Sequence, residues 1–192
     1  MRVLGIAGSM RRHGNTEAAV RAVLDGAAET VGVETELINL RDYRIEFCRG
    51  CYEIHGREGH PCAIQDDMTG LREPLLAADA IVFGSPTYFG GMTGLLRTFL
   101  DRTGPVWGRL RGKLAGIVSV GEDRFGGQEL VGQEIVVFCL SHKLQLAEWP
   151  LCLQAPPGDR AGSLSADAVA MEQTAKLGRS IVAQLRKQVA AI

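Results

Sequence analysis

Three short segments of the sequence combine glycine with hydroxyl, amide or aromatic side chains, and each follows an apolar run. They cover residues 8–16, 86–91 and 119–129. Unpaired N–H groups at the start of a helix, with short hydroxyls beside them, favour phosphate binding. Aromatic rings and backbone groups can lie against a flat heterocycle and hydrogen-bond its edge. Together the segments indicate a site for a phosphorylated heterocyclic ligand.

The first segment has the residues that a single phosphate needs. We expect Ser9, Asn15 and Thr16 to surround the phosphate, with Arg11 supplying positive charge and Gly14 in the turn between them. No Gly-Lys-Ser/Thr follows, so this is not a P-loop. The G-x-G-x-x-G pattern is also absent, so pyrophosphate binding in the Rossmann manner is not expected. The alternative is a capped turn that binds nothing.

The other two segments supply the groups that could contact a ring. In the second segment we expect Tyr88 to face the ligand, whereas Phe89 could instead belong to the core. The candidate ligand-contacting residues of the two segments are Pro86, Thr87, Tyr88, Phe89, Gly90, Ser119, Gly121, Gly126 and Gly127.

Strand and helix patterns alternate along the chain. Apolar runs or alternation predict strands at 2–7, 33–39 (an edge strand), 80–85, 114–120 and 144–149. Helical spacing predicts helices from Asn15 or Thr16 (as the cap) to about 28, and near 71–78 (kinked or started by Pro74), 92–103, 128–141 and 165–190. Repeated strand-then-helix order requires a parallel sheet covered on both faces. Its ligands bind beyond the carboxyl ends of the strands, where the three segments should meet.

Composition narrows the class of protein and its partners. The 192 residues are 46% hydrophobic and 22% charged with a net charge of −1, which is typical of one globular domain. The pI near 6.4 gives no indication of a nucleic-acid or membrane partner. Because no run is long enough to span a bilayer and no signal peptide is evident, we expect a soluble, cytoplasmic protein.

A long excursion at residues 40–66 carries most of the cysteines. Three of the five, Cys48, Cys51 and Cys62, fall within fifteen residues. An odd count without a secretory signal argues against a disulfide framework. A Cys-x-x-Cys pair with His60-Pro61-Cys62 could hold zinc in a tetrahedral set. Excursions of this length within a compact domain are usually functional.

The combined motifs resemble those of the NAD(P)H-dependent FMN reductases of the flavodoxin-like superfamily. The resemblance rests on Gly8-Ser9-x-Arg11-x-x-Gly14-Asn15-Thr16, the stretch Ala78–Gly90, Asp101-Arg102 and Gly126-Gly127-Gln128-Glu129. It implies a doubly wound five-stranded sheet in the order 2-1-3-4-5, with FMN phosphate on residues 9–16. It places the isoalloxazine ring between residues 86–90 and 119–127. It also implies NAD(P)H as donor, a small-molecule or redox-protein acceptor, and a homodimer or homotetramer.

The excursion resembles one branch of this superfamily, the iron–sulfur flavoproteins, which carry a compact four-cysteine motif followed by a sequence like Asp66-Asp67-Met68. Here Ile54 stands where the third cysteine would fall. We favour ordinary thiols in a family remnant over a [4Fe–4S] cluster completed by His55 or His60, or zinc on Cys48, Cys51, His60 and Cys62.

Three other functions are compatible with the same sequence. An electron carrier like flavodoxin would tend to be strongly acidic, which this chain is not. A biosynthetic dehydrogenase could use FMN to oxidise one metabolite, and a sensor could use the cysteine excursion. We therefore expect an FMN-dependent oxidoreductase, in which the flavin carries out the chemistry and no catalytic acid or base is assigned.

Overall fold

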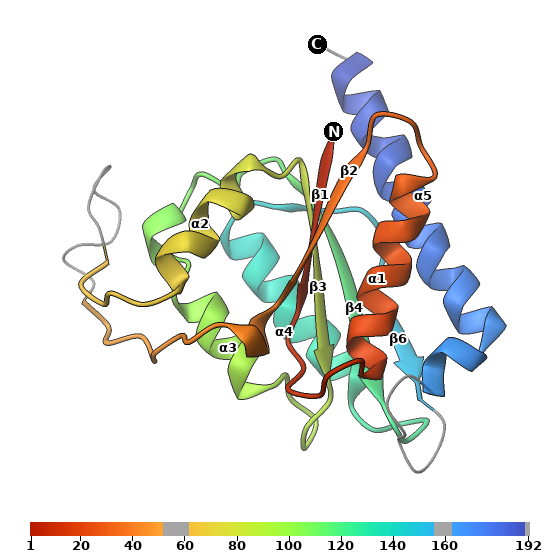
Figure 1. Ribbon diagram of the computed structural model, residues 1–192, viewed down its shortest axis with the longest axis horizontal. Helices are drawn as coiled ribbons and strands as arrows, with labels where there is room; N and C mark the ends of the chain where they lie inside the picture. The colour runs from red at the N-terminus through yellow and green to blue at the C-terminus, as the bar shows by residue number, and fades with distance from the viewer. Residues whose placement is uncertain (52–61, 156–162, 191–192) are drawn as a thin grey trace.

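A parallel sheet covered by helices forms the molecule (Figure 1). The structure is a computed structural model, and it describes residues 1–51, 62–155 and 163–190. The strands are β1 (Arg2–Ala7), β2 (Glu34–Asn39), β3 (Ala80–Pro86), β4 (Leu114–Gly121), β5 (Gln145–Leu146) and β6 (Leu151–Gln154). The helices are α1 (Asn15–Ala28), α2 (Met68–Ala77), α3 (Gly94–Asp101), α4 (Gln128–Ser141) and α5 (Ala168–Ala190), with short 3-10 turns η1 (Leu40–Asp42), η3 (Gly104–Val106) and η4 (Ser163–Ala166).

The strand order confirms the predicted fold class. The sheet runs β2-β1-β3-β4-β5, and β6 also pairs with β4. Each pairing is parallel, and β2 lies at the edge as expected. The carboxyl ends of β1, β3 and β4 therefore meet at one edge of the sheet, which lies at the bottom of Figure 1.

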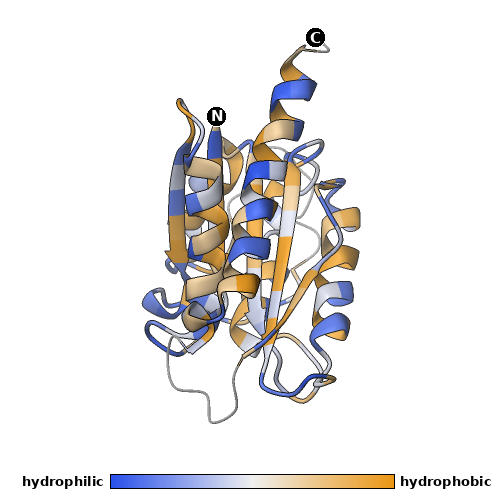
Figure 2. Cartoon of the chain, turned by 90° about the vertical axis from the view of Figure 1, so that its right-hand side faces the viewer, coloured by the Kyte–Doolittle hydropathy of each residue, from blue (hydrophilic) through white to orange (hydrophobic). Residues whose placement is uncertain are grey.

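Two apolar layers bury the faces of the sheet. Helices α1 and α5 cover one face, and α2, α3 and α4 cover the other (Figure 1). Central strands contribute to both layers, since Leu4 and Ile6 pack on one side and Val3 on the other. Figure 2 shows the resulting pattern, with mainly hydrophobic strands between helices that carry both hydrophobic and hydrophilic residues. This rigid frame holds the loops at the carboxyl edge.

The fifth strand differs from the prediction. A single strand at 144–149 was expected, but two short strands pair with different parts of β4. Gln145 and Leu146 lie beside Leu114 and Ala115, whereas β6 runs beside Val118–Gly121. Pro150 stands between them and has no N–H to donate to a ladder. Cys152 consequently lies on β6 and is exposed.

Two helix starts also differ from prediction. Helix α1 has Gly14 as its N-cap and makes no side-chain cap bond, so neither Asn15 nor Thr16 caps it. Helix α2 begins at Met68, and Pro74 lies inside it. Its start is fixed by Asp66, whose carboxylate accepts a hydrogen bond from the Met68 N–H at 3.2 Å. In the part of the chain that the structure describes, no helix combines the length and apolarity needed to cross a membrane.

Candidate functional site

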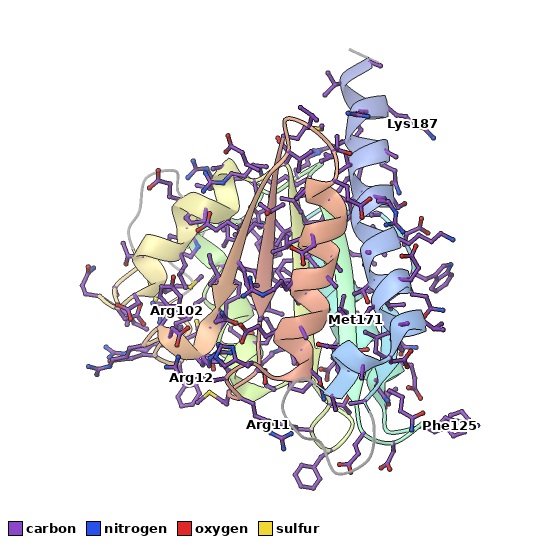
Figure 3. The ribbon with its side chains drawn as sticks, turned by 45° about the vertical axis from the view of Figure 1, so that its right-hand side comes forward. Arg11, Arg12, Arg102, Phe125, Met171 and Lys187 are labelled. Atoms are coloured by element: carbon purple, nitrogen blue, oxygen red, sulfur yellow. The ribbon has the colours of Figure 1, made fainter. Side chains whose placement is uncertain are left out.

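A cavity of about 220 Å³ opens at the carboxyl edge of the sheet, between the loops that follow β1, β3 and β4. Eight of the predicted ligand-contacting residues line it: Ser9, Arg11, Asn15, Thr16, Pro86, Thr87, Tyr88 and Gly121. Arg11 lies at the same lower edge of the view in Figure 3 as Phe125 of the β4–α4 loop. The structure thus brings together the three segments that the sequence singled out.

The β1–α1 loop folds back onto itself. Ser9 is buried, and its hydroxyl accepts a hydrogen bond from the Arg11 N–H at 3.2 Å. Gly14 allows the return, since a Cβ there would stand 3.2 Å from the Cβ of Arg11. Thr16 follows in the first turn of α1 and is also buried. The start of helix α1, with its unpaired N–H groups and partial positive charge, therefore lies at this cavity.

Asn15 lines the cavity but is committed to another contact. Its side-chain oxygen accepts a hydrogen bond from the Leu164 N–H at 2.9 Å, and its amide donates to the Ser163 hydroxyl at 3.2 Å. Asn15 thereby fastens η4 to the start of α1. Asn15 therefore holds η4 in place beside the cavity. The sequence analysis did not predict its contact with Leu164, which lies far along the chain.

The loop after β3 is a tight turn. Tyr88 and Gly91 exchange backbone hydrogen bonds of 2.9 and 3.0 Å. Phe89 and Gly90, the two residues between them, have φ of 51° and 77°, the pattern of a type I′ turn. This turn directs Phe89 outward, where it is fully exposed, so the alternative that Phe89 is core is wrong. Tyr88 lines the cavity and is 44% exposed.

Thr87 carries the most informative polar atom of the cavity. Its backbone N–H donates to the Val120 carbonyl at 2.8 Å, which fixes the residue on the extension of β3. Its hydroxyl is buried and makes no hydrogen bond within the described residues. A buried hydroxyl without a partner is costly unless a ligand or water satisfies it. Thr87, which lines the cavity, therefore has an unused hydrogen-bonding group.

The loop after β4 is organised by Gln128, which the sequence analysis named in the family motif but did not select as a ligand-contacting residue. Its amide donates to the Asp123 carbonyl at 2.6 Å, and its side-chain oxygen accepts from the Gly126 N–H at 2.9 Å. Ser119 is fully buried and donates to the Gln128 carbonyl at 2.7 Å. Ser119 and Gly126 therefore shape the loop and do not line the cavity.

Two of the predicted glycines bring neighbouring loops into contact. Gly127 has φ of 88°, and a Cβ on it would come within 2.7 Å of the Gly90 Cα. The absence of a side chain at Gly127 therefore lets the β3–α3 and β4–α4 loops touch. Neither glycine lines the cavity.

Sequence reasoning missed Val120, Glu122 and Ala155 among the lining residues. Val120 and Glu122 flank Gly121, inside the segment 119–129 that the sequence analysis singled out. Ala155 follows β6, and its N–H donates to the Gly121 carbonyl at 2.7 Å. No local signal marks Ala155, because its place depends on the split fifth strand.

A larger cavity of about 920 Å³ lies between the helices α3 and α4, apart from these loops. Trp107, Phe138 and His142 line it, and their rings are in contact. Burial lowers the pKa of His142 to about 4, so its imidazole is neutral at pH 7. None of the predicted cofactor-binding residues lines this cavity, so the smaller one is the better flavin candidate.

The cysteines of the excursion do not form a metal centre among the residues that the structure describes. Cys48 lines the larger cavity, and Cys62 is buried against the Arg102 guanidinium. Within residues 1–51, 62–155 and 163–190, no three His, Cys, Asp or Glu side chains are grouped so that they could hold a metal ion. His60 and Ile54 lie outside the described residues. A standard [4Fe–4S] cluster uses four thiolates, and the excursion supplies three cysteines.

The order of the parallel strands, with a cavity at their carboxyl edge, defines a flavodoxin-like fold. A solved structure, a WrbA-like flavodoxin from Agrobacterium tumefaciens, matches with a TM-score of 0.66 at 21% identity, covering 97% of this chain and 98% of that one. A family model described as NADPH-dependent FMN reductase matches residues 1–150. The chain belongs to this family and is a flavin oxidoreductase.

Two relatives place the chain more closely. An iron-sulfur flavoprotein from Methanocaldococcus jannaschii is 42% identical over 146 residues, which are 75% of this chain and 74% of that protein. An NAD(P)H dehydrogenase (quinone) from Geotalea daltonii is 32% identical over 160 residues, 80% of this chain and 74% of that protein. The resemblance drawn from the sequence motifs is confirmed.

Proposed function

We propose that the chain binds FMN with its phosphate in the cavity between the β1–α1 loop and Thr87. The observation that carries this proposal is the buried, unpartnered hydroxyl of Thr87, a residue that lines the cavity. Ser9, Arg11 and Thr16, at or just before the start of helix α1, line the same cavity. A phosphate can accept hydrogen bonds from all of these groups.

In this proposal the isoalloxazine ring lies at the open rim, between Tyr88 and the β4–α4 loop. Tyr88, Phe89 and Phe125 are exposed there, so a nicotinamide or an acceptor can reach the ring. When bound, the flavin supplies hydride and single-electron chemistry. The chain's own contribution is to hold the ring and to offer backbone N–H groups near residues 87–90 and 121–127, which stabilise negative charge. The N–H groups of Thr87, Tyr88 and Gly126 are not among them, because they donate within the protein.

We further propose that NAD(P)H is the donor and that the acceptor is a small molecule or a redox protein. The name of the Geotalea relative supports a quinone as one small-molecule acceptor. A net charge of −1 supports an enzyme over a dedicated electron carrier, because such carriers dock through strong charge.

The proposed assembly is a homodimer or homotetramer of single FMN-binding domains, each with the cysteine excursion inserted at residues 40–66. Three aromatic side chains support self-association, since large apolar groups in water favour an interface. Phe47 is 81% exposed and Trp107 is 56% exposed, and Tyr43 is also exposed. In a partner subunit these rings would cover the edge of the neighbouring flavin.

The test is the identity and binding of the released cofactor. Mass spectrometry of the cofactor should show FMN, and anaerobic NADPH or NADH should bleach its absorbance. Thr87→Val removes the hydroxyl with little change in shape and should weaken FMN binding about tenfold. Thr69→Val, on the exposed side of α2, is the matched control and should leave binding unchanged. Recovery of FAD, or equal binding by the Thr87 and Thr69 variants, would contradict the proposal.

A further inference from the structure

A buried ion pair lies directly behind the β1–α1 loop. Glu17, in the first turn of α1, accepts a hydrogen bond from Arg41 Nη2 at 2.7 Å. Arg41 belongs to η1, which follows β2. The side chains of Arg41 and Glu17 are only 5% and 6% exposed. Neither residue lines the cavity, so the pair is not part of the proposed phosphate shell.

The pair holds the backbone of the loop at two points. Arg41 Nη1 donates to the Arg11 carbonyl at 3.0 Å, and the Glu17 carboxylate accepts from the His13 N–H at 3.0 Å. His13 has φ of 54°, in the left-handed region that non-glycine residues rarely adopt. The loop therefore keeps an unfavourable conformation because two of its residues, Arg11 and His13, are tied to this pair.

The two charges of the pair act in opposite directions on an anionic ligand: the Glu17 carboxylate repels it, and the Arg41 guanidinium offsets that repulsion. Burial alone would raise the pKa of Glu17, but hydrogen bonds from Arg41 and from the His13 N–H outweigh it and lower the pKa. Glu17 is thus an ionised carboxylate in the first turn of α1, where a phosphate would also use the positive end of the helix. Arg41 neutralises this carboxylate. Arg21 also contacts it at 3.3 Å, but the Arg21 side chain is 56% exposed.

We propose that Arg41 is a positioning residue for the phosphate-binding loop. It fixes the Arg11 carbonyl, and it cancels the charge of Glu17 that would otherwise repel the FMN phosphate. The proposal rests on the proposed function, because it needs FMN phosphate in the cavity. It predicts an asymmetry between the partners, in which loss of Arg41 harms phosphate binding and loss of the Glu17 charge does not.

The experiment compares FMN with riboflavin, which lacks the phosphate, by titration of flavin fluorescence on the flavin-depleted full chain. Arg41→Met should weaken FMN binding at least about tenfold and leave riboflavin binding within about twofold. Glu17→Gln keeps an oxygen for the His13 N–H and should bind FMN as tightly as the wild type, or more tightly. The double variant E17Q/R41M should bind FMN better than R41M alone.

The control is Arg2→Met. Arg2 forms an ion pair with Glu36 that also joins β1 to β2, but at the far end of the strands from the cavity. The R2M variant should bind both FMN and riboflavin with the affinity of the wild type. Three results would overturn the proposal. R41M could weaken FMN binding and riboflavin binding equally, or it could leave FMN binding unchanged. The double variant could also bind FMN no better than R41M. If R41M does not fold, the E17Q variant tests the proposal alone. A tenfold loss of FMN affinity in E17Q would also overturn the proposal. Failure of the wild type to bind FMN would instead reject the proposed function.

Discussion

Arg102 and Asp66 form a buried ion pair through two hydrogen bonds. Nη1 of Arg102 lies 2.7 Å from Oδ2 of Asp66, and Nη2 lies 2.9 Å from Oδ1, with the two side chains 1% and 2% exposed. Arg102 also donates to the Glu46 carbonyl at 2.7 Å, and Asp66 accepts from the Glu46 N–H at 2.8 Å. Glu46 and Asp66, which flank the three cysteines of the excursion, are therefore fastened to the end of α3, on the side of the sheet where Figure 3 labels Arg102.

Asp66→Asn should destabilise the fold by about 3 kcal/mol, because removal of one partner leaves the Arg102 charge buried and uncompensated. Denaturant unfolding of the flavin-depleted chain measures this difference. The control is Glu29→Gln, which removes the exposed partner of Arg179 and should cost less than about 0.5 kcal/mol. Equal stability of the two variants would show that the buried pair contributes little.

The same pair predicts how stability depends on pH. Burial alone would raise the pKa of Asp66, but the hydrogen bonds from Arg102 and Glu46 lower it below the ordinary value. A carboxyl with a lowered folded pKa stabilises the protein above its unfolded pKa, and this contribution is lost as the pH falls through the folded pKa. The wild type should therefore lose more stability than Asp66→Asn between about pH 5 and pH 3. Parallel curves of unfolding free energy against pH would contradict this.

Most of the fold could be predicted because its signals are local. Strands buried on both faces give continuous apolar runs, and β1 covers residues 2–7 as predicted. Helix α4 likewise has its predicted bounds, 128–141. The split of the fifth strand could not be found this way, because it depends on which part of β4 each half meets.

The cavity was predicted as a meeting of loops, and the structure confirms that meeting. The role of individual residues was harder to predict, because it depends on distant partners. Asn15 is held by Leu164, and Gly127 packs on Gly90, contacts that nothing in the local sequence reveals. Glycines in a suspected binding loop can thus serve loop-to-loop packing.

Arg11 and Thr16 remain predicted phosphate ligands. Arg11→Ala and Thr16→Ala should each weaken FMN binding by roughly ten- to hundredfold, since each removes a charge-assisted contact worth on the order of 1.5–3 kcal/mol. Fluorescence titration with FMN measures the loss. Arg12→Ala is the neighbouring control, because Arg12 pairs with Asp42 at 3.1 Å and does not line the cavity. Unchanged affinity in both test variants would remove this loop from the site.

Self-association should be visible in solution. Static light scattering at micromolar concentration should give two or four times the chain mass of 20.7 kDa. Trp107→Ser and Phe47→Ser remove exposed aromatic side chains and should shift the mass towards that of one chain. Val31→Ser removes another exposed apolar side chain, at a turn before β2, and should not change the mass. A wild-type mass near 20.7 kDa would reject the oligomer.

The cysteine excursion should not carry a standard four-cysteine cluster. Ordinary [4Fe–4S] ligation uses four thiolates, and Ile54, at the place of the third cysteine, cannot ligate iron. Cys139 is a poor substitute because it is fully buried in α4, and burial raises its pKa to about 12, which disfavours the thiolate. Iron and labile sulfide assays on anaerobically purified protein, with zinc by elemental analysis, measure the content directly.

The variant Ile54→Cys makes this prediction sharper, because it restores four cysteines at the motif's spacing. After reconstitution with iron and sulfide under identical conditions, it should take up more iron per chain than the wild type. About four irons and four sulfides in the wild type would contradict the prediction. About one zinc per chain would instead favour the set Cys48, Cys51, His60 and Cys62, whose ligands suit a tetrahedral site.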